Sequence, residues 1–114
     1  MAEADAFRSS RDVIIRTHAW DEAIAFYGSV LNLAVIHNGP TLMGFETGAF
    51  CLYVEKGDGH GPVFEFLVPD VEVAKQRLIT SGCIVQEEDA SVPRCYLRDP
   101  YGFVFNIGQA RSEE

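Results

Sequence analysis

Residues 97–107 read LRDPYGFVFNI and predict a tight hairpin near the C-terminus. Asp99 and Pro100 favour a turn, because proline presets φ and the aspartate side chain can accept a hydrogen bond from the backbone ahead of it. Gly102 can adopt the positive φ that ends such a turn. The alternation after the turn predicts a strand with Asn106 as the polar side chain of one face, and an apolar opposite face formed by Phe103, Phe105 and Ile107.

The length and composition predict one globular domain. The chain has 114 residues, of which 47% are hydrophobic and 23% are charged, with a net charge of −8. This acidity argues against nucleic acid as a partner, because nucleic-acid binding depends on cationic side chains. No apolar run is long enough to span a membrane, and the first residues lack a signal-peptide pattern, so we expect no membrane partner and a cytoplasmic location. Three cysteines without metal-site spacing indicate reduced packing residues.

The first half of the chain predicts the order β-α-β-β-β. Residues 1 to about 10 read as a frayed terminus, and 12–18 read as a β-branched strand. Asp21 and Glu22 favour the start of a helix, whose expected buried stripe is Ala23, Phe26, Tyr27, Val30 and Leu31. Three short strands are expected at 33–37, 42–46 and 50–55, and Asn38-Gly39 marks the first hairpin.

The same order then repeats after a glycine-rich joint. Residues 57–62 predict a linker between a first module, about 12–56, and a second module, about 63–109. Residues 63–68 read as a strand, and Asp70 is the expected N-cap of a helix that ends at Gly82. Two more strands, 83–86 and 92–97, precede the closing hairpin. A shift of 51 places Asp12 on Val63, and a shift of 54 places Gly48 on Gly102, which indicates an internal repeat.

Two motifs carry a resemblance to a known family. The DPYGFVFN segment resembles the Asp-Pro-x-Gly-x-x-x-Glu element of the vicinal oxygen chelate superfamily, which includes glyoxalase I, extradiol dioxygenases and bleomycin resistance proteins. Residues 23–31, AIAFYGSVL, look like the family's first-helix signature, Ala-x-x-Phe-Tyr-x-x-x-Leu. The resemblance implies an α+β fold in which two tandem βαβββ modules form a cup-shaped mixed sheet, with the helices on its convex side.

The family's metal-ligand positions hold unsuitable residues. In metal-dependent members, the first and last strands of both modules offer His or Glu ligands to one divalent ion. Here the resemblance places Asp12, Leu52, Val63 and Asn106 at those positions. A catalytic metal usually needs three protein ligands, and Leu52 and Val63 have no donor atom. We therefore expect no metal and no other cofactor. The histidines His18, His37 and His60 are expected to be solvated.

If Asp12 and Asn106 face into the cup, as the resemblance implies, the strand period of two gives the rest of its expected lining. It comprises apolar residues together with Arg16 and Glu65, and Arg16 falls where glyoxalase I carries an arginine that meets its anionic substrate. Arg16 and Glu65 serve either as ligand contacts or as a structural ion pair. The candidate ligand-binding residues are Asp12, Ile14, Arg16, Phe50, Leu52, Val63, Glu65 and Asn106, and Val54, Leu67 and Val104 are expected on the same faces.

Two functions are compatible with this pattern. The favoured function is a metal-free protein, similar to bleomycin resistance proteins and so to antibiotic resistance, that sequesters a small cationic or aromatic molecule and has no catalytic residues. The alternative is a divergent metal-dependent lyase, isomerase or dioxygenase that recruits a metal through Asp12. We also expect a homodimer, because pairing would cover the edges of an open sheet.

Overall fold

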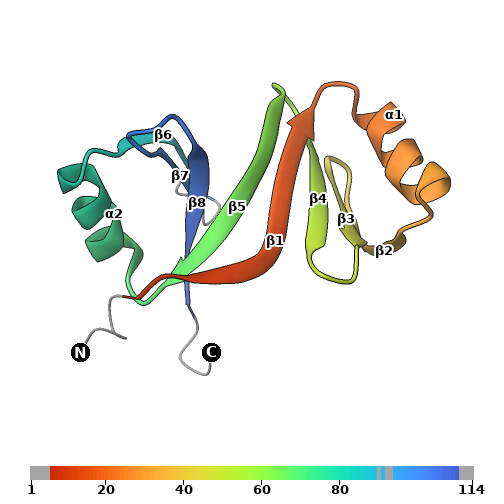
Figure 1. The fold of residues 1–114 in the computed structure, drawn as a ribbon. Helices are drawn as coiled ribbons and strands as arrows, with labels where there is room; N and C mark the ends of the chain where they lie inside the picture. The colour runs from red at the N-terminus through yellow and green to blue at the C-terminus, as the bar shows by residue number, and fades with distance from the viewer. Residues whose placement is uncertain (1–5, 90, 92–93, 111–114) are drawn as a thin grey trace. The chain divides into compact units, whose positions relative to one another are not determined.

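A computed structural model describes residues 6–89, 91 and 94–110 (Figure 1). Its elements follow the order β-α-β-β-β twice along the chain, with a short π-helical turn, η2, after the first helix. Their contacts divide the described residues into two compact units. We call residues 11–63 the first unit, and residues 6–10 with 64–110 the second unit. The predicted α+β class is confirmed.

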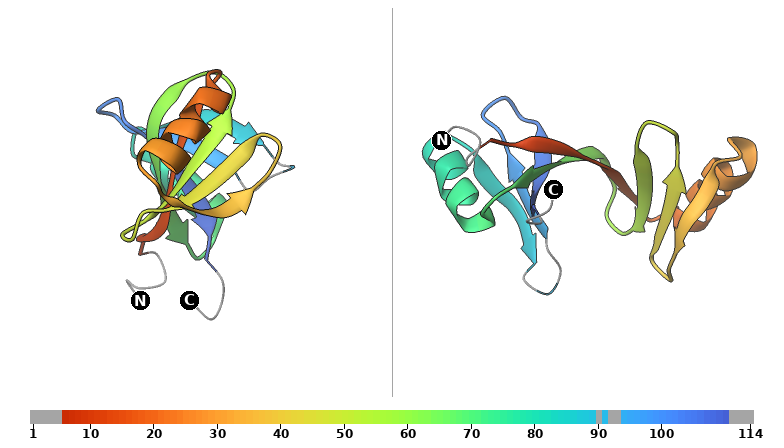
Figure 2. Two further views of the ribbon diagram at one scale, coloured as in Figure 1. Left: turned by 90° about the vertical axis from the view of Figure 1, so that its right-hand side faces the viewer. Right: turned by 90° about the horizontal axis from the view of Figure 1, so that it is seen from below.

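The first unit is a four-stranded mixed sheet with a helix on one face (Figures 1 and 2). Its strand order is β2-β3-β4-β1, and only the β1–β4 pair is parallel. Its elements are β1 (Arg8–Thr17, which begins in the second unit), α1 (Trp20–Ala25), η2 (Phe26–Val30), β2 (Ala34–Asn38), β3 (Leu42–Glu46) and β4 (Cys51–Lys56).

Trp20 anchors the first helix on the core of this unit. Its indole N–H donates to the backbone oxygen of Val54 at 2.8 Å, so the buried ring keeps a hydrogen-bond partner. The buried core consists of Trp20, Phe45, Leu52 and Val54, with Tyr27 packed against it. The expected buried stripe is wrong in part, because Phe26, Val30 and Leu31 are exposed.

The π-helical turn explains this difference. The N–H of Leu31 bonds to the oxygen of Phe26 at 3.0 Å, five residues back, so the turn is wider than an α-helical turn. Residues spaced for an α-helix then no longer fall on one face, and Tyr27 is the aromatic residue of the turn that packs against the core.

The second unit repeats the same arrangement. Its strand order is β5-β8-β7-β6, and β5 and β8 are parallel. Its elements are β5 (His60–Val68, which begins in the first unit), α2 (Val71–Thr80), β6 (Ile84–Asp89), β7 (Arg94–Arg98) and β8 (Val104–Gln109). The core beneath α2 consists of Val68, Ala74, Cys83, Cys95, Leu97 and Ile107. Phe7 packs against this core, so part of the expected frayed terminus is ordered.

Several local signals behave as predicted. The side chain of Asp99 accepts hydrogen bonds from the backbone N–H of Tyr101 at 2.9 Å and of Phe103 at 3.0 Å. Gly102, in the hairpin turn, has a φ of 98°. Gly82, just after α2, has a φ of 107°. The apolar face expected for Phe103, Phe105 and Ile107 is buried only in part, since Phe103 is exposed. In the described residues, no helix is long and apolar enough to cross a membrane.

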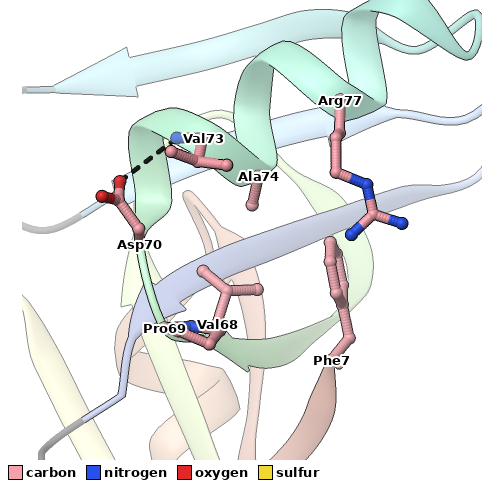
Figure 3. A pocket seen from close by; sticks show the side chains of 7 residues that line it. All are labelled: Phe7, Val68, Pro69, Asp70, Val73, Ala74 and Arg77. Carbon is pink, nitrogen blue, oxygen red and sulfur yellow. Dashed lines mark hydrogen bonds between the residues drawn. The ribbon is translucent and has the colours of Figure 1, made fainter. Parts of the chain in front are cut away.

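Asp70 provides a direct test of the predicted N-cap. Its Oδ1 accepts from the backbone N–H of Val73 at 3.1 Å (Figure 3). We expect Asp70→Ala to lower the free energy of unfolding by about 1 kcal/mol in urea titrations, because an N–H at the start of α2 loses its partner. Asp21→Ala is the control, because α1 begins without a side-chain cap. It should lower the free energy of unfolding by only a few tenths of the loss expected for Asp70→Ala. Equal effects would contradict the capping role.

Candidate functional site

The open sheet face of the second unit, opposite α2, carries a row of polar side chains. Glu65 on β5 lies beside Asn106 on β8, and Asn106 lies beside Tyr96 on β7. Glu65 is half-buried, and Asn106 and Tyr96 are buried. Such a row on one face follows from the period of two along each strand.

Asn106 fixes the position of the Glu65 carboxylate. Its side chain is 4% exposed, and its Nδ2 donates to Oε2 of Glu65 at 2.9 Å. Its Oδ1 accepts the backbone N–H of Cys95 at 2.8 Å. Gly108 leaves room for the carboxylate, because a Cβ there would lie 2.9 Å from Oε2 of Glu65. The amide therefore acts as a bridge between the backbone and the acid.

Sequence reasoning did not include Tyr96 or Arg94 in this site. The guanidinium of Arg94 lies 5.3 Å from the ring centroid of Tyr96, and its Nη1 donates to Oε2 of Glu87 at 3.1 Å. The two residues alternate with Cys95 and Leu97, which point into the core. That alternation was the available signal, since a strand with buried residues at odd positions must present the even positions on its other face.

The open face of the first unit carries an ion pair and a carboxyl group whose pKa is raised. Asp12, Ile14 and Arg16 share one face of β1 and lie beside Cys51, Tyr53 and Glu55 of β4. The Nε of Arg16 donates to Oε1 of Glu55 at 2.9 Å, and both side chains are largely buried. Burial raises the pKa of Asp12, although the positive charge of Arg11 opposes this effect.

The structure corrects the expected lining on β4. Leu52 and Val54 lie in the core beneath α1, on the opposite face from Asp12, and Phe50 lies in the turn before the strand. The cause is the place of the glycine in each turn. Gly48 is the second of the four residues that join β3 to β4, whereas Gly102 is the fourth of the five that join β7 to β8, so the shift of 54 between the glycines becomes 53 in the strands that follow. A shift of one residue turns every side chain to the other face. The counterpart of Asn106 is therefore Tyr53.

Tyr53 supplies an aromatic surface that sequence reasoning missed. A Cβ at Gly44 would lie only 2.7 Å from its ring, so the ring lies directly over this glycine. The His37 ring follows on β2, with its centroid 6.4 Å from that of Tyr53. Gly44 is thus required for a flat ring to lie on the sheet, and this requirement was the signal in the sequence.

The predicted residues fall into two separate groups. Asp12, Ile14 and Arg16 lie together in the first unit, where Val63 is buried, and Glu65 and Asn106 are in direct contact in the second. Convergence of the two groups, including an Arg16–Glu65 pair, stays a prediction.

Other sites in the described residues are less suited to chemistry. Burial raises the pKa of the Cys83 and Cys95 thiols, which disfavours the reactive thiolate. The cavity in Figure 3, bounded by Phe7, Asp70 and Arg77, has a volume of about 20 Å³. That volume suits a single water molecule and is too small for an organic ligand.

Comparisons with known proteins identify the fold. No family model and no curated protein matches the sequence. A glyoxalase/bleomycin resistance protein/dioxygenase superfamily member from Vibrio splendidus is 18% identical with a TM-score of 0.67, over 92% of this chain and 100% of that one. A variant of homoprotocatechuate 2,3-dioxygenase from B. fuscum is 20% identical with a TM-score of 0.70, over 96% of this chain and 34% of that one. The chain has the glyoxalase/bleomycin resistance/dioxygenase fold.

This fold also occurs in a Mn(II)-bound glyoxalase from Novosphingobium aromaticivorans, which is 18% identical with a TM-score of 0.63, over 91% of this chain and 40% of that one. The chain thus spans well under half of the glyoxalase and about a third of the dioxygenase. The predicted resemblance is confirmed at the level of the fold.

The residues at the four positions that the resemblance assigns to a metal fit one poorly. With Tyr53 in place of Leu52, the four positions hold Asp12, Tyr53, Val63 and Asn106. Val63 has no donor, and the one oxygen of the Asn106 side chain already accepts the N–H of Cys95. Within the described ranges, no three His, Cys, Asp or Glu residues gather as a metal site would require. Metal independence nevertheless stays a prediction.

Proposed function

We propose that the chain is a metal-independent binding protein of the glyoxalase/bleomycin resistance/dioxygenase superfamily that sequesters a small molecule. The observation that carries this proposal is the bridge at Asn106. Where the resemblance expects a metal-binding carboxylate, the chain has a buried amide whose oxygen and nitrogen serve Cys95 and Glu65. A metal-dependent lyase, isomerase or dioxygenase would need that oxygen, so this alternative is disfavoured.

The chemistry of the open faces favours a cationic or aromatic ligand. Glu65 is a half-buried carboxylate held in one orientation, which suits a ligand amine or another strong donor. Tyr53 offers a ring supported by Gly44, which suits stacking. Arg16, held by Glu55, offers a cation to a ligand oxygen. Ile14 beside Tyr53 adds apolar surface, as small-molecule sites usually require.

The proposal is tested by thermal-shift screening with a defined panel. The panel contains cationic aromatic amines, with bleomycin among them, and the protein is assayed before and after dialysis against EDTA. We expect the melting temperature to be unchanged by EDTA and elemental analysis to find well under one equivalent of zinc, nickel, manganese or iron. We also expect a panel compound to raise the melting temperature equally in both samples. A stoichiometric metal that stabilises the fold would overturn the proposal.

Variants separate ligand contacts from structural charges. Glu65→Gln keeps an oxygen that can accept a hydrogen bond from Asn106 but removes the negative charge. It should therefore raise the dissociation constant for a cationic compound at least tenfold. Arg16→Met removes the cation on the other open face. Glu22→Gln, an exposed carboxylate on α1, is the control and should bind as the natural chain does. If binding survives both site changes while the unliganded protein loses stability, Arg16 and Glu65 are structural and the site assignment is wrong.

A further inference from the structure

A cation on the open face of the second unit lies over an aromatic ring. Tyr96 is 2% exposed, although its side chain lies on the sheet face opposite α2. The guanidinium carbon of Arg94 lies over the Tyr96 ring, 5.3 Å from its centroid. A cation at this distance is attracted by the negative face of the ring. Arg94 is therefore one of the groups that cover Tyr96.

A carboxylate holds the guanidinium in this position. Glu87 on β6 lies opposite Tyr96 in the β6–β7 ladder, and its Oε2 accepts a hydrogen bond from Nη1 of Arg94 at 3.1 Å. Asp89, at the end of β6, lies opposite Arg94 itself. The cation thus lies on an aromatic ring with a carboxylate beside it. Proteins use the same two interactions to recognise the cationic groups of ligands.

The covered ring lies close to the carboxylate that we propose for ligand binding. Tyr96 lies opposite Asn106, which is bonded to Glu65, so Glu87, Tyr96, Asn106 and Glu65 form one row across the four strands. Neighbouring strands are about 5 Å apart, which places Tyr96 about 10 Å from Glu65. A molecule with one or two rings at Glu65 would therefore extend to Tyr96, where Arg94 already lies.

Arg94 reaches the ring from its own strand. It precedes Tyr96 by two residues on β7, so the two side chains share a face of the sheet. The side chain of Arg94 is 19% exposed, which places it at the boundary with solvent. Rotation about its side-chain bonds would move the guanidinium from the ring without moving the strand.

We infer that Arg94 competes with the ligand from within the chain: its guanidinium occupies the place over Tyr96 and beside Glu87 that the cationic group of a bound molecule takes. This inference rests on the proposed function and narrows its ligand class. A group that replaces a guanidinium on a ring face should itself be flat and charged, as amidines, guanidines and protonated aromatic amines are. Arg94 then determines specificity, because a molecule with a weaker cation does not displace it.

Isothermal titration calorimetry of the full chain with benzamidine tests this inference. Benzamidine carries a flat amidinium group on one ring, and benzamide is an uncharged compound of nearly the same shape. We expect Arg94→Ala to lower the dissociation constant for benzamidine at least tenfold relative to the natural chain, because the ring of Tyr96 and the carboxylate of Glu87 become available to the ligand. The affinity for benzamide should change by less than a factor of three.

Arg98→Ala is the matched control. Arg98 is an exposed residue at the end of β7, on the same face as Arg94, so its removal changes the net charge by the same amount. It should leave the dissociation constant for benzamidine within a factor of three. Adding Glu87→Gln to Arg94→Ala should remove most of the gain, because the bound amidinium then loses its carboxylate partner.

Three results would overturn the inference. No gain for Arg94→Ala would mean that the Arg94–Glu87 pair is only structural, an equal gain for Arg98→Ala would indicate general charge attraction, and an equal gain for benzamide would indicate only an opened cavity. Circular dichroism and the melting temperature of each variant confirm folding. If Arg94→Ala fails to fold, Arg94→Gln replaces it, because it also removes the charge and should still give a several-fold gain.

The outcomes also separate this inference from the proposed function. If the natural chain binds a compound of the thermal-shift panel but Arg94→Ala gives no gain with benzamidine, only the inference is refuted. If Arg94→Ala gives the gain but the natural chain binds no panel compound, the inference is supported and sequestration by the natural chain is refuted.

Discussion

At pH 7, Asn106→Asp is expected to lower the free energy of unfolding by about 3 kcal/mol, because it places a second carboxyl group against Glu65 in a buried position. The change removes the N–H that Glu65 accepts at 2.9 Å and replaces an attraction with a repulsion. It alters only one atom of the side chain, so the packing around position 106 is retained. The loss is therefore electrostatic in origin.

The pH dependence gives this prediction its sign. Burial and the neighbouring acid raise the folded-state pKa of the new carboxyl pair above its unfolded value of about 4. A group with a raised folded-state pKa loses its stabilising contribution as the pH rises. The free energy of unfolding of the variant should therefore be close to that of the natural chain near pH 4 and lower than it toward pH 7. Urea titrations at several pH values measure this difference.

Asn38→Asp is the matched control for this experiment, since Asn38 is an exposed residue at the end of β2. It should change the free energy of unfolding by less than about 0.5 kcal/mol at any of these pH values. A pH-independent loss for Asn106→Asp would show that shape, and not the charge of Glu65, determines the requirement at position 106.

The fold could be predicted from the sequence because its signals are local. Asp99 and Gly102 specify one hairpin, and Asp70 and Gly82 mark the two ends of α2. The repeated order of elements indicates the α+β class. The first helix was predicted less well, because a π-helical turn depends on tertiary packing of Tyr27 and Phe45 and not on spacing alone. The anchoring role of Trp20 depends on a hydrogen bond to Val54 from a distant strand, which no local pattern reveals.

The candidate site was predicted in part, for a reason that strand geometry makes clear. Glu65 and Asn106, both expected among the ligand-binding residues, are in direct contact, because the hairpin turn sets the register of β8. Leu52 was placed on the wrong face, because it was counted from Gly48, which does not have the same place in its turn as Gly102. Comparing the number of residues between each glycine and the strand that follows would have identified Tyr53. No such comparison would have revealed the Asn106 bridge, since it requires the position of the Cys95 backbone.

Phe45→Ala is expected to have the largest effect on the first unit, with a loss of about 4 kcal/mol in the free energy of unfolding. Phe45 is 1% exposed and lies at the centre of the core formed with Trp20, Leu52 and Val54. Its ring centroid lies 6.2 Å from that of Tyr27, and a Cβ built at Gly28 would lie 3.4 Å from its Cε1. Truncation would leave a cavity beneath η2 that the rigid sheet cannot fill.

Urea titration measures this loss, and Phe45→Leu provides a second point, with about 1 to 2 kcal/mol expected, should the alanine variant fail to fold. Phe103→Ala is the control, because this ring is 70% exposed, and it should change the free energy of unfolding by less than about 0.5 kcal/mol. The contrast tests the assignment of the two phenylalanines directly: both are large aromatic residues in strand-rich sequence, but only Phe45 lies beneath a helix. A loss below about 1 kcal/mol for Phe45→Ala would mean that the core of the first unit lies elsewhere.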